Sequence, residues 1–413
     1  MPFSNSEAAL FELASAPENH IWRGRPCWAS IDLNAIERNV QTMLRLIGPM
    51  VQLMAVVKAN AYGHGLAGTA MTLFQAGASS FGVACVDEGA QLRSAGIDCP
   101  IIVLGYVPHW EAMRVLQLDL TVALTTKELA IALSSAAQTL QRSATVHIKV
   151  DTGMSRFGLL PGEVRAFLEY TRSVPGLHVE GIFTHLATAD EDDKTFAREQ
   201  LSIFDSLCCI LDKEGTRPHI RHAVNSAGVI AFPEHHYEMV RTGVCLYGVP
   251  PADMPGLPEL APALSLKARV ARIRKLPVAT SVGYGSTYRT ASDTDVALLP
   301  IGYADGFSRA LSNIGQVLIH GRRASVIGRI SMDQTTIDVT GLGPIQHDDE
   351  VTLIGRQCDD EITATEVGAW RGTIAYEVLT GLSVRIPRIY VRDGMPVAVA
   401  ENGEFRKLDL ASY

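Results

Sequence analysis

The sequence has little that would direct it to a membrane, a nucleic acid or a secretory route. None of its apolar runs approaches the ~18 residues that a transmembrane helix needs. Near the N-terminus, Glu7, Glu12 and Glu18 stand where a secretory signal would have a basic region and an apolar run. Lys and Arg number 36 against 44 Asp and Glu, so the basic excess typical of nucleic-acid or anionic-membrane binding is missing. We therefore expect a cytoplasmic protein with neither kind of partner.

The cysteines indicate neither a disulfide framework nor a metal site. There are seven, no pair has CxxC spacing, and several lie in apolar runs. His219 and His222 are three residues apart, but no spaced cysteine pair accompanies them, so we expect no metal. The remaining expectation is reduced, mostly buried thiols.

The composition is that of a large folded protein. Apolar residues make up 47% of the 413 residues and charged residues 19%, which excludes intrinsic disorder. At roughly 100–200 residues per domain, this length predicts about two domains. Residues 250–262 contain five prolines and predict a linker. We therefore expect an N-terminal extension over 1–25, a first domain over 26–262 and a second over 263–413.

The first domain alternates between short apolar segments and stretches with helical periodicity. A capping box at Asn34–Glu37 predicts an opening helix that ends at Gly48. Eight later segments predict strands: Val51–Lys58, Ser80–Val86, Pro100–Val107, Leu120–Thr125, Thr145–Asp151, His178–His185, Ile220–Asn225 and Glu238–Tyr247. Their continuous apolarity indicates strands buried on both faces. Helical stretches separate most of them, which predicts an α/β TIM-like (β/α)8 barrel, with a doubly wound open sheet as the alternative.

The second domain has short segments separated by turn residues. The expected strands are Lys267–Lys275, Asp295–Ile301, Gln316–His320, Ala324–Ile330, Thr335–Val339 and Glu350–Ile354. This pattern predicts a mostly-β C-terminal domain.

Lys58 ends an otherwise apolar strand. The C-terminal ends of barrel strands point toward the mouth where barrel enzymes keep their chemistry. A lysine there is partly desolvated, which lowers its pKa and favours amine chemistry such as Schiff-base formation. Position alone also fits a lysine whose stem lies along apolar surface at a strand end.

The segment Ala55–Gly65, which reads Ala-Val-Val-Lys-Ala-Asn-Ala-Tyr-Gly-His-Gly, resembles the pyridoxal-phosphate attachment segment of alanine racemases. Other segments similar to that family are Ile148–Gly158, Thr184–Asp190, Asn225–Ala227, Val240–Gly243, Gly283–Tyr288, Ile301–Gly306, Ser331–Gln334 and Tyr376–Glu377. The resemblance implies a barrel that binds pyridoxal 5'-phosphate and a C-terminal β domain. It also implies a head-to-tail homodimer with shared active sites, which interconverts L- and D-alanine and supplies D-alanine for peptidoglycan.

By this resemblance, Lys58 and Tyr284 are the two catalytic acid–bases. Racemisation removes a proton from Cα on one face and delivers another on the opposite face. Lys58 is expected to hold the cofactor at rest and to act toward the D-enantiomer, while the other protomer's Tyr284 acts toward the L-enantiomer. Because a free tyrosine has a pKa near ~10, a basic Tyr284 would need a neighbouring cation or hydrogen bonds.

The resemblance also assigns the cofactor contacts. They are Lys58, Tyr62, His185, Asn225, Ser226, Arg241, Gly243 and Tyr376. Arg241 would face the pyridine nitrogen and, because arginine stays protonated, leave that nitrogen unprotonated. His185 would pack on the ring, and Tyr62, Ser226, Gly243 and Tyr376 would hold the phosphate, in loops that commonly do so in barrels. Without the resemblance, these would be ordinary turn, core or ion-paired residues.

Three residues are implied on the substrate side. Arg156 would anchor the substrate carboxylate, Met332 would offer its backbone N–H to the same group, and Tyr303 would limit the size of the substrate side chain. The family's lysine that matches Lys149 can be carbamylated, which would turn this cation into an anion able to hold Arg156. The sequence departs from some family members at Ser331, where they carry cysteine.

Other functions remain as alternatives. One is a racemase of the same family with broad specificity or a preference for serine. Another is a non-catalytic pyridoxal-phosphate-binding barrel, which would not need Tyr284 or Met332. A third is a fold-related amino-acid decarboxylase, whose second-domain cysteine signature is missing here.

Overall fold

The computed structural model describes residues 24–408, which form two compact units. The barrel unit is Asp32–Ala263, and the β unit combines the described residues up to Ile31 with those from Leu264 onward. All but Gly24 and Arg25 of the expected N-terminal extension lie outside the described residues. The expected first domain starts at residue 26, whereas the barrel unit starts at Asp32.

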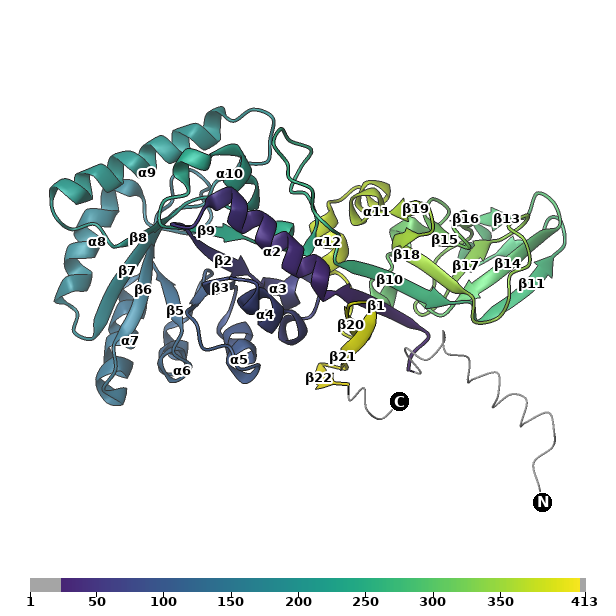
Figure 1. The fold of residues 1–413 in the computed structure, drawn as a ribbon, viewed down its shortest axis with the longest axis horizontal. Coiled ribbons are helices and arrows are strands. Elements are labelled where there is room, and N and C mark those ends of the chain that lie inside the picture. The colour runs from purple at the N-terminus through teal and green to yellow at the C-terminus, as the bar shows by residue number, and fades with distance from the viewer. Residues whose placement is uncertain (1–23, 409–413) are drawn as a thin grey trace, which may run out of the picture. The chain divides into compact units, whose positions relative to one another are not determined.

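The barrel unit contains eight parallel strands in a near-closed barrel (Figure 1). They are β2 (Gln52–Val56), β3 (Ser80–Val83), β4 (Ile101–Val103), β5 (Thr121–Leu124), β6 (Ala144–Lys149), β7 (Leu177–Phe183), β8 (Ile220–His222) and β9 (Met239–Thr242). Neighbours pair in the order β8-β7-β6-β5-β4-β3-β2-β9. Where β8 and β9 meet, the Arg241 N–H donates to the Val224 carbonyl at 3.1 Å. Each strand overlaps one predicted segment, and the predicted TIM-like barrel is confirmed.

The helices of this unit lie outside its strands (Figure 1). They are α2 (Leu33–Ile47), α3 (Lys58–Tyr62), α4 (Leu66–Gln75), α5 (Val86–Ser94), α6 (Ala112–Gln117), α7 (Lys127–Leu140), α8 (Pro161–Ser173), α9 (Thr195–Lys213) and α10 (Ser226–Ala231).

The predicted cap of the opening helix is wrong. Helix α2 begins at Leu33, and its N-cap is Asp32, whose carboxylate accepts the Ala35 N–H at 3.0 Å. Asp32 still has the extended backbone of the preceding strand, which suits an N-cap residue. Asn34 therefore lies inside the first turn.

The β unit is built on one large sheet, as the predicted mostly-β domain requires. Its strands are β1 (Cys27–Asp32), β10 (Leu264–Arg269), β11 (Arg272–Leu276), β14 (Thr294–Leu299), β15 (Gln316–Ile319), β16 (Arg322–Val326), β17 (Thr335–Asp338), β18 (Glu350–Gln357), β19 (Asp360–Ile362), β20 (Arg388–Arg392), β21 (Met395–Glu401) and β22 (Glu404–Lys407). A small second sheet pairs β12 (Ser281–Val282) with β13 (Tyr288–Arg289). Two helices, α11 (Ala364–Arg371) and α12 (Ala375–Thr380), complete the unit.

Strand pairing explains two differences from the predicted β domain. Strand β1 pairs antiparallel with β10, with Trp28 opposite Lys267, so this N-terminal segment belongs to the β unit. The predicted strand Lys267–Lys275 is two strands, β10 and β11, and β11 pairs with β14. Such long-range pairings cannot be recognised from local patterns.

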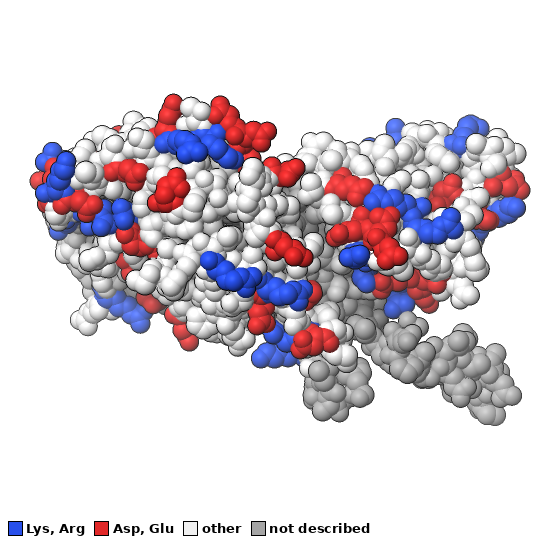
Figure 2. Space-filling model, turned by 45° about the horizontal axis from the view of Figure 1, so that its top comes forward, with Lys and Arg blue, Asp and Glu red and all other residues white. Residues whose placement is uncertain are grey.

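The surface and the thiols complete the description. Basic and acidic side chains are interspersed on the face drawn in Figure 2. Over residues 24–408, no helix combines the length and apolarity needed to cross a membrane.

The seven cysteines are free, but only Cys27, Cys208 and Cys245 are buried, so the expectation of mostly buried thiols is wrong.

The backbone after Lys58 makes a left-handed turn. Ala59, Asn60, Ala61 and Tyr62 have φ values of 53°, 55°, 54° and 51°. This conformation costs L-residues roughly 1–2 kcal/mol each. Glu88 from α5 supports the turn by accepting the N–H groups of Ala59 at 2.6 Å and Ala84 at 2.7 Å. The turn fixes the direction in which the chain leaves Lys58.

Substitutions at Ala59 should report this strain. Ala59→Gly should raise the free energy of unfolding by up to about 1 kcal/mol, because glycine adopts positive φ without a Cβ clash. Ala59→Val should lower it by about 1–2 kcal/mol, because branching at Cβ worsens that clash. Chemical denaturation measures both values. Ala67→Gly in helix α4 is the matched control and should lower stability by about 0.5–1 kcal/mol. Equal losses of unfolding free energy in Ala59→Gly and Ala67→Gly would contradict a strained backbone at Ala59.

Candidate active site

The barrel unit collects its predicted site residues at the C-terminal ends of its strands. Lys58 follows β2, and Lys149 ends β6. His185 follows β7, and Arg241 lies in β9. Arg156 belongs to the loop after β6 and influences the pKa of Lys58, as Arg241 does. These five residues therefore gather at the barrel mouth, where Arg156 and Arg241 supply positive charge.

The Lys58 amine is adapted to act as a free base. Desolvation lowers its pKa first, and the nearby cations Arg156 and Arg241 lower it further. Glu88 opposes this effect in part. A larger fraction of the amine is therefore neutral at a given pH, and only the neutral amine is a nucleophile or a base.

Lys149 is more strongly perturbed. Its side chain is buried, and burial together with Arg241 and Arg156 lowers its pKa to about 7. The amine donates to the Val150 carbonyl at 2.8 Å and lies 5.2 Å from the centre of the Phe183 ring. Near neutral pH, about half of this amine is therefore uncharged.

Arg241 is buried, with 3% of its surface exposed, and makes four hydrogen bonds. One nitrogen, Nη2, faces the carbonyls of Thr184 at 2.9 Å and Ala223 at 2.8 Å, and His185 Nδ1 at 3.0 Å. The other, Nη1, faces His222 Nδ1 at 2.9 Å. Burial lowers its pKa to about 9, which still leaves it protonated at neutral pH. The guanidinium is thus a fixed donor at the mouth.

His185 is neutral, with a defined tautomer. Burial and the surrounding cations hold the pKa of its imidazole well below its usual value. Because Arg241 can only donate, His185 Nδ1 must accept, and the ring proton is on Nε2.

A second group of predicted residues provides hydrogen-bond donors. The Gly243 N–H donates to Ser226 Oγ at 2.9 Å. A Cβ on Gly243 would collide with the Tyr62 hydroxyl. The Gly243 backbone, the Ser226 hydroxyl and the Tyr62 hydroxyl therefore lie close together. Asn225 caps α10 by accepting the Gly228 N–H at 2.9 Å. Burial raises the pKa of Tyr62, which therefore remains a donor. Two hydroxyls and a backbone N–H at a helix start suit an anion such as phosphate.

The remaining predicted residues lie in the β unit. Tyr284, Tyr303 and Met332 have exposed fractions of 71%, 42% and 53%. The backbone joins two of them, because Tyr303 N–H donates to the Ser331 carbonyl and Ala304 N–H to the Met332 carbonyl. Tyr284 lies on a short turn between β12 and β13, and Tyr376 lies in α12.

A cation accompanies the turn that carries Tyr284. A Cβ on Gly285 would lie 2.7 Å from Arg329 Nη1, so this guanidinium lies against the turn.

Sequence reasoning missed Glu88, His222 and Arg329. His222 was considered only as a metal ligand, yet it is the partner of Arg241. Its signal was a histidine in a short strand between apolar segments, three residues before Asn225. Across residues 24–408, no group of three or more His, Cys, Asp or Glu could hold a metal ion.

Comparisons with known proteins identify the family. The family model "Alanine racemase, N-terminal domain" matches residues 31–251, and "Alanine racemase, C-terminal domain" matches residues 263–390. The alanine racemase of Symbiobacterium thermophilum is 48% identical over 367 residues, which cover 89% of this chain and 97% of that protein. That of Carboxydothermus hydrogenoformans is 44% identical over 369 residues, covering 89% of this chain and 100% of that protein.

Solved structures give the same result. The crystal structure of alanine racemase from Bacillus anthracis with bound L-Ala-P has a TM-score of 0.87 and 37% sequence identity, and the match covers 91% of this chain and 98% of that one. Both domain models match in order, and together they span most of the residues described here. The chain belongs to the alanine racemase family.

Proposed function

We propose that this protein interconverts L-alanine and D-alanine with pyridoxal 5'-phosphate and so supplies D-alanine for peptidoglycan. The observation that carries the proposal is the Lys58 amine, whose pKa is lowered, at a barrel mouth that also holds Arg241 and a set of anion-binding donors. Relatives named alanine racemase and a family structure with bound L-Ala-P support alanine as the substrate. They do not favour the broad-specificity or serine-preferring alternative.

The residues present fit the proposed cofactor. Tyr62, Ser226 and Gly243 present donors where a phosphate would be held, and Asn225 orders the helix start beside them. Tyr376 of α12 is assigned to the same group by family resemblance. Lys58 would hold the aldehyde carbon, His185 would pack on the ring, and Arg241 would face the ring nitrogen. When bound, pyridoxal phosphate supplies an electron sink for a carbanion at the substrate Cα.

Two side chains move the proton. Lys58 Nζ accepts or returns the Cα proton on the D side, and Tyr284 Oη does so on the L side. Racemisation needs a proton carrier on each face because a single base would return the proton to the face from which it came. The Arg329 guanidinium lies against the turn that carries Tyr284.

The remaining residues position the substrate. Arg156 binds the carboxylate, and the Met332 backbone supplies an N–H to the same group. Tyr303 limits the substrate side chain to a small size, which favours alanine. Arg241 remains a donor because its pKa is too high for it to act as an acid near neutral pH.

The active form in this proposal is a head-to-tail homodimer. Tyr284, Met332 and Tyr303 are largely exposed in the single chain, which supports a role for them at the partner's barrel mouth. Seven free thiols support a cytoplasmic location, since disulfides form in oxidising compartments.

Alanine in deuterated water tests the reaction itself. Purified protein should abolish the optical rotation of L-alanine and introduce deuterium at Cα. Lys58→Ala should lose the visible absorbance of lysine-bound cofactor and more than about 1,000-fold of the racemisation rate. Lys213→Ala, which changes an exposed lysine in α9, is the control and should retain the absorbance and the racemisation rate.

Serine turnover equal to that of alanine would favour the broad-specificity alternative, and carbon dioxide release from diamino acids would favour a decarboxylase.

Tyr284→Phe should keep bound cofactor and impair proton removal from L-alanine more than from D-alanine. Equal retention of both directions would refute the two-base assignment. Solvent-deuterium incorporation from each enantiomer measures the two rates separately.

Heterodimers test whether the sites are shared. A purified heterodimer of Lys58→Ala and Tyr284→Phe subunits should regain about half of the activity, because one of its two shared sites is intact. The two homodimers serve as controls. No recovery would mean that each site is built from a single chain.

Lys149 should form a carbamate. Its neutral amine attacks carbon dioxide and releases a proton, and that amine predominates above its pKa of about 7. With 13C-bicarbonate, a carbamate NMR signal should therefore be present at pH 8 and lost toward pH 6. Lys149→Arg is the matched control, because it keeps a cation that cannot react. A signal that persists in this variant would contradict the assignment.

A further inference from the structure

Arg241 carries a buried positive charge that no carboxylate contacts directly. Its four hydrogen-bond acceptors are two carbonyls and two imidazole nitrogens, all formally neutral. In the part of the chain that the structure describes, no Asp or Glu forms an ion pair with it. A buried charge without a counter-ion is costly, so the groups behind the direct partners of Arg241 must help to stabilise it.

One of those partners leads deeper into the barrel. His222 faces Arg241 through Nδ1 at 2.9 Å and His147 Nδ1 through Nε2 at 2.8 Å. His147 then faces Glu180 Oε2 through its own Nε2 at 3.1 Å. Both imidazoles are fully buried. We call Arg241, His222, His147 and Glu180 the Arg241–Glu180 network.

The chemistry of its two ends fixes every proton in this network. The guanidinium can only donate, so His222 Nδ1 accepts and its proton is on Nε2. His222 therefore donates to His147 Nδ1, and the His147 proton is on Nε2. That proton is donated to Glu180, whose ionised carboxylate can only accept. The bond from His147 lowers the pKa of Glu180 and keeps it ionised.

The fold reserves space for this arrangement. Phe183 stacks on His222 with ring centroids 4.6 Å apart and an interplanar angle of 6°. A Cβ on Gly181 would lie 2.5 Å from His147 Nδ1, so only glycine fits beneath that ring. The pairing of β6 with β7 shifts register beside His147, and the shift leaves Glu180 as the extra residue of β7.

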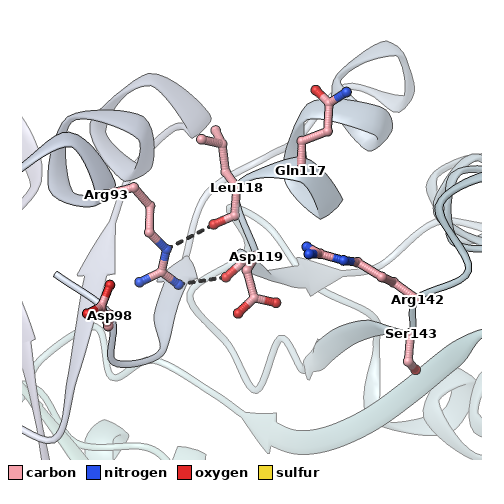
Figure 3. A pocket seen from close by; sticks show the side chains of 7 residues that line it. All are labelled: Arg93, Asp98, Gln117, Leu118, Asp119, Arg142 and Ser143. Carbon is pink, nitrogen blue, oxygen red and sulfur yellow. Dashed lines mark hydrogen bonds between the residues drawn. The ribbon is translucent and has the colours of Figure 1, made fainter. Parts of the chain in front are cut away.

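Glu180 reaches the opposite face of the barrel from Lys58. Together with Asp98, Asp119 and Ser143 it lines a cavity of about 170 Å³ at the N-terminal ends of β4, β5 and β6. Figure 3 shows the adjoining pocket, where Asp98 and Asp119 lie beside Arg93, which donates to the carbonyls of Leu118 and Asp119. The network thus spans the barrel from its mouth to this basal cavity.

We propose that Glu180 and His147 are positioning residues whose carboxylate-anchored hydrogen bonds set the tautomer of His222, so that His222 always presents a lone pair to Arg241. Glu180 also acts as the remote counter-ion of the guanidinium through the two imidazoles. Neither residue touches the site at the barrel mouth, so both act only through Arg241.

The consequence for catalysis rests on the proposed function. If Arg241 orients the cofactor ring, loosening its hold should lower kcat and leave the KM for alanine nearly unchanged. Second-sphere partners of this kind typically contribute about 10-fold or more to activity.

Reversing the charge at the basal end tests the inference. In 15N-histidine-labelled protein, both His147 and His222 should have a protonated Nε2 and an unprotonated Nδ1. Glu180→Lys should disturb both tautomers, because an ammonium donates where His147 also donates. Glu180→Gln keeps an acceptor oxygen and should preserve both tautomers. Glu180→Lys should lower kcat about 10-fold, whereas Glu180→Gln should keep kcat within about twofold of the original value. Both variants should keep the KM for alanine within about twofold of the original value.

The matched control is Asp98→Lys. It reverses a charge in the same cavity without touching the network, and it should leave both imidazoles and kcat unchanged. A proton on His147 Nδ1 in the original protein would overturn the proposal, as would unchanged imidazole signals in Glu180→Lys or an equal effect of Asp98→Lys. The NMR result is independent of racemisation, so intact tautomers in a protein inactive on alanine would overturn only the proposed function.

Discussion

The placement of a guanidinium inside a closed set of parallel strands is the constraint on which the site depends. Arg241 leaves solvent almost completely, yet each of its hydrogen bonds ends on a fixed group of β7, β8 or the segments that follow them. Because an arginine cannot accept a hydrogen bond, it imposes tautomers on His185 and His222. The rest of the barrel mouth is organised around a buried donor that stays protonated near neutral pH.

The same charge explains the amines around it. Lys58 and Lys149 are desolvated by the barrel and repelled by Arg241 and Arg156, so both titrate below an ordinary lysine. Lys149 is shifted further because it is more deeply buried, although Asp151 partly opposes the shift. One local excess of positive charge thus raises the neutral, nucleophilic fraction of two amines.

Local patterns were sufficient wherever a feature depended on neighbouring residues. The eight buried strands were predicted because continuous apolarity is a property of each segment itself. Prediction failed where distant residues decide. Asp32 rather than Asn34 caps α2 because β1 ends there, and β1 joins the β unit because it pairs with β10, more than 230 residues away in sequence.

The sequence by itself determined the barrel and the reactive segment around Lys58, because strand patterns and a contiguous motif survive without any knowledge of contacts. Only the tertiary structure decided that His222 belongs beside Arg241, that Arg329 lies against the Tyr284 turn, and that Glu180 ends a buried network. These contacts join residues on different strands or turns, and their partners depend on barrel closure and strand register. Barrel closure and strand register produce no periodic pattern in the amino-acid sequence.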